Sequence, residues 1–433
     1  MRKRFICFLM IAAMLMTACG KQPEAVKTTP TPSTPVQEVT PTPTAVPTST
    51  PTPTPDPKAK YNEMIADSLI QTGNNYRVRK VIEKAKAGED VYIGFIGGSI
   101  TEGEGCGYDN CYACQTFRNF AEDFGLGDNV HMINAGVSGT PSTLGVIRYE
   151  RDLIEKNDGH KPDLLIIEFA VNDGDDPTNG STYEGLIRRA LYDDNQPAVV
   201  LLFSVFKSKW NLQDRLKPMG RHYELPMVSI KDAVVPRLTN GTITNAQFFN
   251  DEYHPKLYGH TIMADCLRYL FTTIMQEEPS KEDTPVKEPY KSDAFDHVHM
   301  ITAKSSDVKV TAGGFSATDK VIGTTRYDKA PTFPDNWKHT KDSGNKALSF
   351  NVKAKSILLT YKKSSSDSFG KVDVFVDGQK VATIDGHDAG GWNNPYTAVI
   401  LNTDTVASHK VEVKMAEGNA DKEFTVMAFG YGD

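Results

Sequence analysis

Beyond its first twenty residues the chain lacks any apolar run long enough to span a bilayer. It also lacks a strong excess of charge of either sign, since the formal net charge is −7 at pH 7. Surfaces that bind nucleic acid are usually strongly basic, so this balance argues against nucleic acid as a partner. The sequence after residue 20 therefore indicates neither a membrane-spanning helix nor a nucleic-acid-binding surface.

Cysteine is scarce as well, with 6 residues in the chain. Cys106, Cys111 and Cys114 lie close together, but no histidine lies near them in the sequence to complete a zinc site. In an exported protein we therefore expect a disulfide within this loop, whose pairing the sequence leaves open, and Cys266 as a buried helical thiol. No metal or cofactor is expected.

Residues 1–19 have the pattern of an export signal. A basic start is followed by an apolar stretch that is too short for a comfortable membrane span. The segment ends in Leu-Met-Thr-Ala-Cys-Gly, which resembles a bacterial lipobox with Met16 in place of the usual leucine. This resemblance implies a lipid on Cys19 and an extracellular lipoprotein anchored to a membrane. An ordinary cleaved signal is the alternative, and it also places the protein outside the cytoplasm.

Residues 20–57 predict an extended tether. Eleven Pro and eleven Thr fall within residues 22–57, and such a segment cannot bury a core. Proline favours the polyproline conformation, which would give the segment a reach of roughly 110 Å at about 3.1 Å per residue. We expect it to lift a catalytic domain off the membrane, although a passive spacer would have the same composition.

The rest of the chain is long enough for two domains, and a charged, proline-punctuated linker at 277–291 divides them. Within 58–276, apolar runs alternate with helical patterns, and this alternation predicts a three-layer α/β/α parallel sheet. The expected strands are 91–96, 130–133, 164–169, 199–206 and 227–230, and the expected helices are near 112–124, 141–156, 181–195, 210–220 and 257–274.

From 292 to 433 the apolar period changes to two. Val372, Val374 and Val376 alternate with other residues, and Asp377-Gly378 offers a hairpin turn into the next strand. This pattern predicts a separate all-β sandwich domain.

Ser99 follows the first expected strand in the segment Gly97-Gly98-Ser99. The two glycines allow a sharp turn into a helix, whose first N–H groups favour developing negative charge. No lysine follows, as a phosphate-binding loop requires, and Thr101 stands where a nucleophile elbow has its second glycine. By itself, the serine could simply cap a helix.

Asp251 and His254 supply what a serine nucleophile needs. A histidine can take the hydroxyl proton near neutral pH. A carboxylate three residues earlier can fold back around a turn to accept the Nδ1 proton. The alternative is an aspartate that caps the final helix beside a surface histidine.

Gly139 and Asn172 follow the second and third expected strands. The carboxyl ends of parallel strands lie at one edge of a sheet, so these residues belong near Ser99. The N–H of Gly139, the side-chain amide of Asn172 and the N–H of Ser99 would together make an oxyanion hole.

These four segments, in this order, resemble the blocks of the SGNH (GDSL-like) hydrolase family over residues 90–275. The resemblance implies a flavodoxin-like sheet in which Ser99 is the nucleophile, His254 its base and Asp251 the residue that orients the base. It also implies that Ser99, Gly139 and Asn172 form the oxyanion hole. Two positions depart from the family pattern, because Gly98 replaces the usual aspartate and Ala170 replaces a glycine.

An exported SGNH-like protein with a tether and an appended β-domain resembles esterases that remove acetyl groups from plant polysaccharides such as xylan or mannan. The resemblance implies an acyl-enzyme mechanism on an acetylated polysaccharide or oligosaccharide. The alternatives are a lipase or thioesterase, a peptidoglycan O-acetylesterase, and a non-catalytic surface lipoprotein that binds glycan.

Aromatic residues in two loops are candidates for substrate binding. Trp210 could line a sugar-binding cleft or simply begin a surface helix. Trp392 and Asn393 lie in a turn-rich loop that suits stacking on a sugar ring, or the tryptophan could pack back onto the protein. The sequence leaves open which hydroxyl position is deacetylated, whether the β-domain binds glycan, and the oligomeric state.

Overall fold

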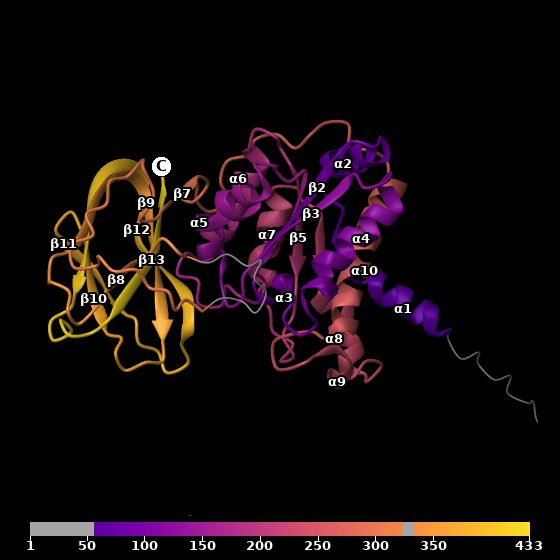
Figure 1. Ribbon diagram of the computed structural model, residues 1–433. Coiled ribbons are helices and arrows are strands. Elements are labelled where there is room, and N and C mark those ends of the chain that lie inside the picture. Colours follow the sequence, from indigo (N-terminus) through magenta and orange to yellow (C-terminus); the bar gives the residue numbers. More distant parts are fainter. Residues whose placement is uncertain (1–55, 324–332) are drawn as a thin grey trace, which may run out of the picture. The chain divides into compact units, whose positions relative to one another are not determined.

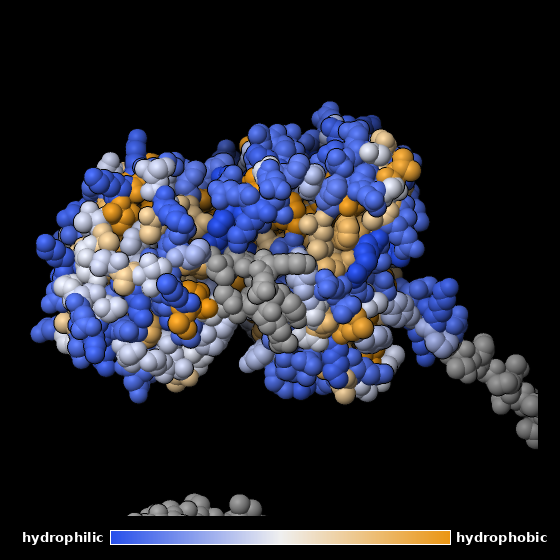
Figure 2. Space-filling model, in the orientation of Figure 1, coloured by the Kyte–Doolittle hydropathy of each residue, from blue (hydrophilic) through white to orange (hydrophobic). Residues whose placement is uncertain are grey.

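The structure is a computed structural model that describes residues 56–323 and 333–433 (Figure 1). The predicted export signal with Cys19, and all but the last two residues of the predicted tether, lie outside the described residues. No helix in the described ranges is both long and apolar enough to cross a membrane. On the face shown in Figure 2, hydrophobic residues gather in small patches between hydrophilic ones.

The first domain is built on a six-stranded sheet in the order β1-β6-β5-β4-β2-β3. Pairing is parallel from β2 to β6, and only β1 runs antiparallel, at the edge beside β6. The five parallel strands are those expected from the sequence, and their order is flavodoxin-like. The strands are β1 (Leu69–Gln71), β2 (Val91–Gly97), β3 (Val130–Gly136), β4 (Leu164–Glu168), β5 (Ala198–Phe203) and β6 (Met227–Ser229).

Helices cover both faces of this sheet, as the three-layer prediction requires. One face carries α1 (Pro57–Ala66), α2 (Tyr76–Lys86), α4 (Tyr112–Phe124), α8 (Ile230–Thr239) and α10 (Leu257–Gln276). The other carries α5 (Ser142–Leu153), α6 (Ser181–Tyr192) and α7 (Gln213–His222). Four short turns complete the domain: α3 (Ser99–Glu102), α9 (Asn245–Phe248), η1 (Tyr108–Asn110) and η2 (Glu155–Asn157).

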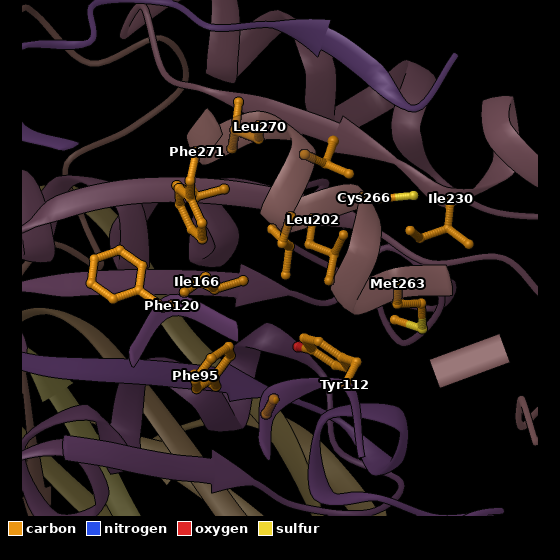
Figure 3. Close-up of a cluster of buried hydrophobic side chains, with 14 of the residues drawn as sticks. Phe95, Tyr112, Phe120, Ile166, Leu202, Ile230, Met263, Cys266, Leu270 and Phe271 are labelled. Carbon is orange, nitrogen blue, oxygen red and sulfur yellow. The ribbon is translucent and has the colours of Figure 1, made fainter. Parts of the chain in front are cut away.

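The strands hold these layers together because successive side chains point to opposite faces. Phe95 and Ile166 lie in the cluster under α4 and α10, whereas Ile96 and Ile167 lie in the cluster under α5 and α6. Figure 3 shows the first cluster, in which side chains of α4 and α10 meet those of the central strands. The near-continuous apolar runs of the sequence reflect this burial on both faces.

The cysteines correct one expectation. All four cysteines in the described residues are free thiols, so the disulfide expected in the 106–114 loop is not formed. Cys111 instead caps α4, with its Sγ accepting a hydrogen bond from the N–H of Cys114 at 3.4 Å. The Cys106 thiol points to the carbonyl oxygens of Gly103 and Gly107. Cys266 is a fully buried thiol on α10, as predicted (Figure 3).

The second domain is a single seven-stranded antiparallel sheet in the order β11-β10-β12-β9-β13-β7, with β8 paired to β13. The all-β prediction is confirmed, and β10 turns into β11 through Asp377 and Gly378, both with positive φ. The strands are β7 (Val298–Ile301), β8 (Trp337–His339), β9 (Leu348–Ser364), β10 (Lys371–Val376), β11 (Gln379–Asp385), β12 (Trp392–Met415) and β13 (Phe424–Gly432).

Two long strands shape this domain. β9 has 17 residues and β12 has 24, and their pairing is interrupted between Asn402 and Ala407. Leu348 and Phe350 from the first half of β9 line the same hydrophobic cluster as Leu359 from its second half. One continuous sheet therefore folds around its own core, as bulges in long strands allow.

The linker between the domains is tied down along its length. The buried carboxylate of Glu184 accepts hydrogen bonds from the N–H groups of Tyr290, Lys291 and Ser292 at 2.5, 2.8 and 3.1 Å. Side chains of both domains then share one hydrophobic cluster, in which Ile147 belongs with residues of β9 and β13. This close packing fixes the β-domain against α5 and α6.

Candidate active site

Three strands of the first sheet end level with one another. Gly97, the last residue of β2, pairs with Gly136 of β3 on one side and with Glu168 of β4 on the other. This edge is also where the strand order reverses, the usual location of ligand sites in such sheets. The segments that carry Ser99, Gly139 and Asn172 therefore leave the sheet together.

Two glycines shape the turn into Ser99. A Cβ on Gly97 would lie 2.1 Å from Thr101 Oγ1 and 2.6 Å from the carbonyl oxygen of Glu168. A Cβ on Gly98 would lie 2.5 Å from the side-chain amide nitrogen of Asn172. Glycine at 98, where the family pattern usually has aspartate, thus allows the Asn172 amide to lie against the backbone that precedes the serine.

Ser99, His254 and Asp251 form a hydrogen-bonded chain. The Nε2 atom of His254 lies 2.9 Å from Ser99 Oγ, and its Nδ1 atom lies 3.0 and 2.9 Å from the two carboxylate oxygens of Asp251. Because an ionised carboxylate only accepts hydrogen bonds, Nδ1 carries the proton. Nε2 is then free to accept the serine proton, as a general base must.

The carboxylate of Asp251 is held ionised. Partial burial acts to raise its pKa, but hydrogen bonds from the His254 ring and from the N–H groups of Tyr253 and His254 outweigh it. The pKa of Asp251 is thereby lowered to about 2. An anionic partner at this distance orients the imidazole and stabilises its protonated form.

The turn that carries His254 is braced on both sides. The N–H of Asn250 donates to the His254 carbonyl oxygen at 2.8 Å, and the N–H of Lys256 donates to that of Phe248 at 2.7 Å. A Cβ on Gly105 would lie 2.4 Å from the carbonyl oxygen of Pro255, so the loop after α3 packs directly on this turn. The imidazole is therefore fixed before any substrate arrives.

Gly139 and Asn172 lie on opposite sides of the Ser99 turn, because β3 and β4 flank β2. Gly139 has a φ of 69°, a left-handed conformation that glycine adopts at no steric cost. Asp173, the neighbour of Asn172, is fully buried and accepts a hydrogen bond from the N–H of Ser142 at 2.8 Å. It thus ties the loop after β4 to the start of α5.

Two aromatic side chains stand beside these loops. Trp210 stacks on Phe206, with ring centroids 5.8 Å apart, and Phe206 packs edge-on against Tyr253. Of the two alternatives for Trp210, the helix start does not hold, because Trp210 lies in the loop before α7. From the other domain, Trp392 lies 3.4 Å from the position of a Cβ on Gly139. Trp210 and Trp392 are 40% and 46% exposed, so each offers ring surface to a ligand.

Asn393 is engaged within its own domain. Its Oδ1 atom accepts a hydrogen bond from Ser364 Oγ at 2.8 Å, and its carbonyl oxygen accepts one from the N–H of Gly323 at 2.7 Å. With a φ of 67°, it shapes the turn that presents Trp392.

A cavity elsewhere in the structure lies apart from this site. A cavity of about 590 Å³ between α5 and β7 is lined by Arg151, Arg189 and His299 among others, but by none of the residues placed at the candidate active site. Among the described residues, no group of three or more His, Cys, Asp or Glu side chains could hold a metal ion.

Sequence reasoning missed Arg148. This fully buried residue of α5 donates to the carbonyl oxygens of Gly97, at 2.9 Å, and of Ala135. It therefore joins the ends of the two strands that lead to Ser99 and Gly139. No sequence signal identifies it, because an arginine four residues before Asp152 on a helix has the pattern of an exposed ion pair.

A known family model matches the part of the chain that carries this geometry. Residues 95–262 match the model of the GDSL-like lipase/acylhydrolase family. The chain carries a GDSL-like acylhydrolase domain. The match begins within β2, contains β3 to β6 and ends within α10, and so includes Ser99, Asp251 and His254.

Solved structures extend the likeness to both domains. A two-domain esterase (CEX) active on acetylated mannans, co-crystallised with mannopentaose, is 29% identical with a TM-score of 0.73. The alignment covers 85% of this chain and 98% of that one. A second structure of this esterase is 27% identical over 85% and 99% of the two chains, with a TM-score of 0.74. The comparison with curated proteins gave no match. The chain is thus a carboxylic ester hydrolase that shares both of its domains with this esterase.

Proposed function

We propose that this protein removes O-acetyl groups from mannan, or from a closely similar plant polysaccharide, by an acyl-enzyme mechanism. The observation that carries the proposal is the likeness to an esterase active on acetylated mannans, which extends over 98% of that chain and therefore includes the β-domain.

In the proposed reaction, Ser99 Oγ attacks the ester carbonyl carbon while its proton passes to His254 Nε2. The negative charge on the carbonyl oxygen is stabilised by the N–H groups of Ser99 and Gly139 and by the amide of Asn172. The bond to the sugar oxygen then breaks, and His254 returns its proton to that oxygen. A water molecule, deprotonated by His254, releases acetate and restores the serine.

The geometry supports these roles. The distance of 2.9 Å between Ser99 Oγ and His254 Nε2 suits proton transfer. Asp251, with its pKa lowered to about 2, stays anionic throughout the working pH range and stabilises the imidazolium. The Asn172 amide lies against Gly98, one residue before the nucleophile.

The polysaccharide would be held by the exposed aromatic rings of Trp210 and Trp392. Sugar rings stack on aromatic faces through their C–H groups, and the exposed tryptophans offer such faces, Trp210 beside Gly174 and Trp392 beside Gly139. Trp392 comes from the β-domain, so that domain would complete the binding cleft beside Gly139.

We also propose that the protein acts outside the cell as a lipoprotein, anchored through Cys19 and held off the membrane by the proline-rich tether. The proposal rests on the basic start, the apolar stretch and the Cys19-Gly20 junction of the sequence. The test is to express the full chain and the Cys19→Ser variant in a bacterial host. The unchanged chain should fractionate with membranes and the variant should not. Equal membrane association of both would contradict the anchor.

The function itself is tested by measuring acetate release from acetylated mannan, xylan, pectin and peptidoglycan, with Ser99→Ala as a matched control. We expect the highest rate on mannan and none from the variant. A higher rate on peptidoglycan would favour a cell-wall O-acetylesterase. Negligible rates on all four polymers, with turnover of long-chain acyl esters, would favour a lipase.

A further inference from the structure

Glu102 lies on the same short helix as the nucleophile, and its side chain reaches the loop of Gly139. It is only 2% exposed. Its Oε2 atom accepts hydrogen bonds from the N–H of Ser138 at 2.9 Å and from the Ser138 hydroxyl at 2.5 Å. Ser138 directly precedes Gly139. Glu102 Oε2 therefore accepts both hydrogen bonds that Ser138 donates, and Ser138 is the neighbour of Gly139, the proposed oxyanion donor.

The end of β3, which leads into this loop, also packs closely on α3. A Cβ on Gly136 would lie 2.3 Å from the backbone nitrogen of Glu102. The side chain of Asn134 donates to the carbonyl oxygen of Thr101 at 2.9 Å. The segments that carry Ser99 and Gly139 are thus joined to each other directly, rather than only through the sheet.

A buried positive charge supports the carboxylate. Arg148 is fully buried, which lowers the pKa of its guanidinium, while Asp152 at 3.3 Å and, more weakly, Glu102 favour its cationic form. A buried ion needs such a partner because burial in a medium of low dielectric constant is costly. Arg148 also donates to the carbonyl oxygens of Gly97 in β2 and Ala135 in β3. The same side chain therefore carries the positive charge and joins the two strands that lead to Ser99 and Gly139.

We propose that Glu102 is a positioning residue that holds the N–H of Gly139 where the oxyanion forms. The inference rests on the proposed function, because it assigns Glu102 a part in the same acyl transfer. An oxyanion donor acts only in the transition state, and displacement by about 1 Å can lower the rate by about 10²-fold. Loss of Glu102 should therefore lower kcat and leave KM nearly unchanged.

The test compares Glu102→Gln and Glu102→Ala on a small chromogenic acetyl ester. Glutamine keeps an acceptor oxygen for Ser138, so we expect a kcat loss of about 10-fold, against about 100-fold for alanine. KM should stay within about 3-fold in both, as expected when an interaction made only in the transition state is lost. The rate of inactivation by an organophosphonate, which forms a tetrahedral adduct, should fall in parallel.

Glu184→Gln is the matched structural control. Glu184 is also a buried glutamate that accepts N–H groups, but it holds the linker at Tyr290 to Ser292. This variant should lower the unfolding temperature and leave kcat at 25 °C unchanged. If Glu102→Ala behaves in the same way, with lowered stability and a kcat within about 2-fold of the unchanged protein, the positioning role is refuted.

Two further variants, Ser138→Ala and Ser99→Ala, distinguish failure of the positioning role from misfolding and from failure of the proposed function. If Glu102→Ala fails to fold, Glu102→Gln and Ser138→Ala decide the question, since each weakens the contact without removing it entirely. Ser99→Ala separates the inference from the proposed function. Full activity of Ser99→Ala would refute the proposed nucleophile. An inactive Ser99→Ala beside fully active Glu102 variants would refute the positioning role alone.

Discussion

Gly98→Ala should strongly lower kcat although it removes no functional group. A Cβ at this position would lie 2.5 Å from both the nitrogen and the oxygen of the Asn172 side-chain amide. Ordinary contact begins near 3.4 Å, so the amide must move by roughly 1 Å, which is enough to misplace an oxyanion donor. Loss of one such donor lowers kcat by about 10²–10³-fold, or about 3–4 kcal/mol of transition-state stabilisation.

The assay is steady-state hydrolysis of a chromogenic acetyl ester, with kcat and KM measured separately. We expect Gly98→Ala to lower kcat by about 10²-fold with KM within about 3-fold. Because the effect acts through Asn172, adding Gly98→Ala to Asn172→Ala should cause little further loss, and this non-additivity separates displacement from general damage. A well-folded Gly98→Ala with near-normal kcat, or with effects that add to those of Asn172→Ala, would refute the reasoning.

Three other predictions follow from the same contacts. Asp251→Asn should lower kcat/KM by about 10³–10⁴-fold at neutral pH, because the imidazolium loses its anionic partner; a loss below about 10-fold would contradict this. Burial raises the pKa of Glu168 from 4.5 to about 7, so its ionisation opposes folding by about 3 kcal/mol above pH 7 and not below pH 4.5. Urea unfolding of Glu168→Gln at pH 5 and pH 8 should show a smaller decline in stability with rising pH than the unchanged protein; an equal decline would exclude Glu168 as its source. Trp392→Ala should raise KM for acetylated mannan several-fold and leave hydrolysis of a small ester unchanged; equal effects on both would argue against a polymer contact.

The parallel sheet could be predicted because burial on both faces leaves a direct mark on the sequence. The runs that end at Gly97 and Glu168 are apolar at almost every position, as expected of strands that are covered on both faces. β1 could not be predicted, since three residues cannot display a period. The single folded sheet of the second domain could not be predicted either. Apolar and polar residues alternate in one bent strand in the same way as in two separate strands.

The residues that form the candidate site could be predicted from the sequence motifs, but the buried residues that hold them in place could not. Ser99 and His254 are 155 positions apart, and only the order of the family blocks relates them. Glu102 and Arg148 are charged residues, which sequence patterns assign to the surface, yet both are buried under the loops. The expected disulfide was wrong because Cys111 serves as the helix cap of α4, a role that depends on where the helix begins.

The central claim is that Ser99 is the nucleophile. Its most direct test is labelling with a fluorophosphonate, which reacts with activated serines, followed by peptide mapping and acetate release from acetylated mannan. The account predicts one adduct, on Ser99, with activity lost in proportion to labelling. It predicts no adduct in the Ser99→Ala variant or in the His254→Ala variant. An adduct on another residue that tracks the loss of activity, or full activity with Ser99 fully labelled, would contradict it.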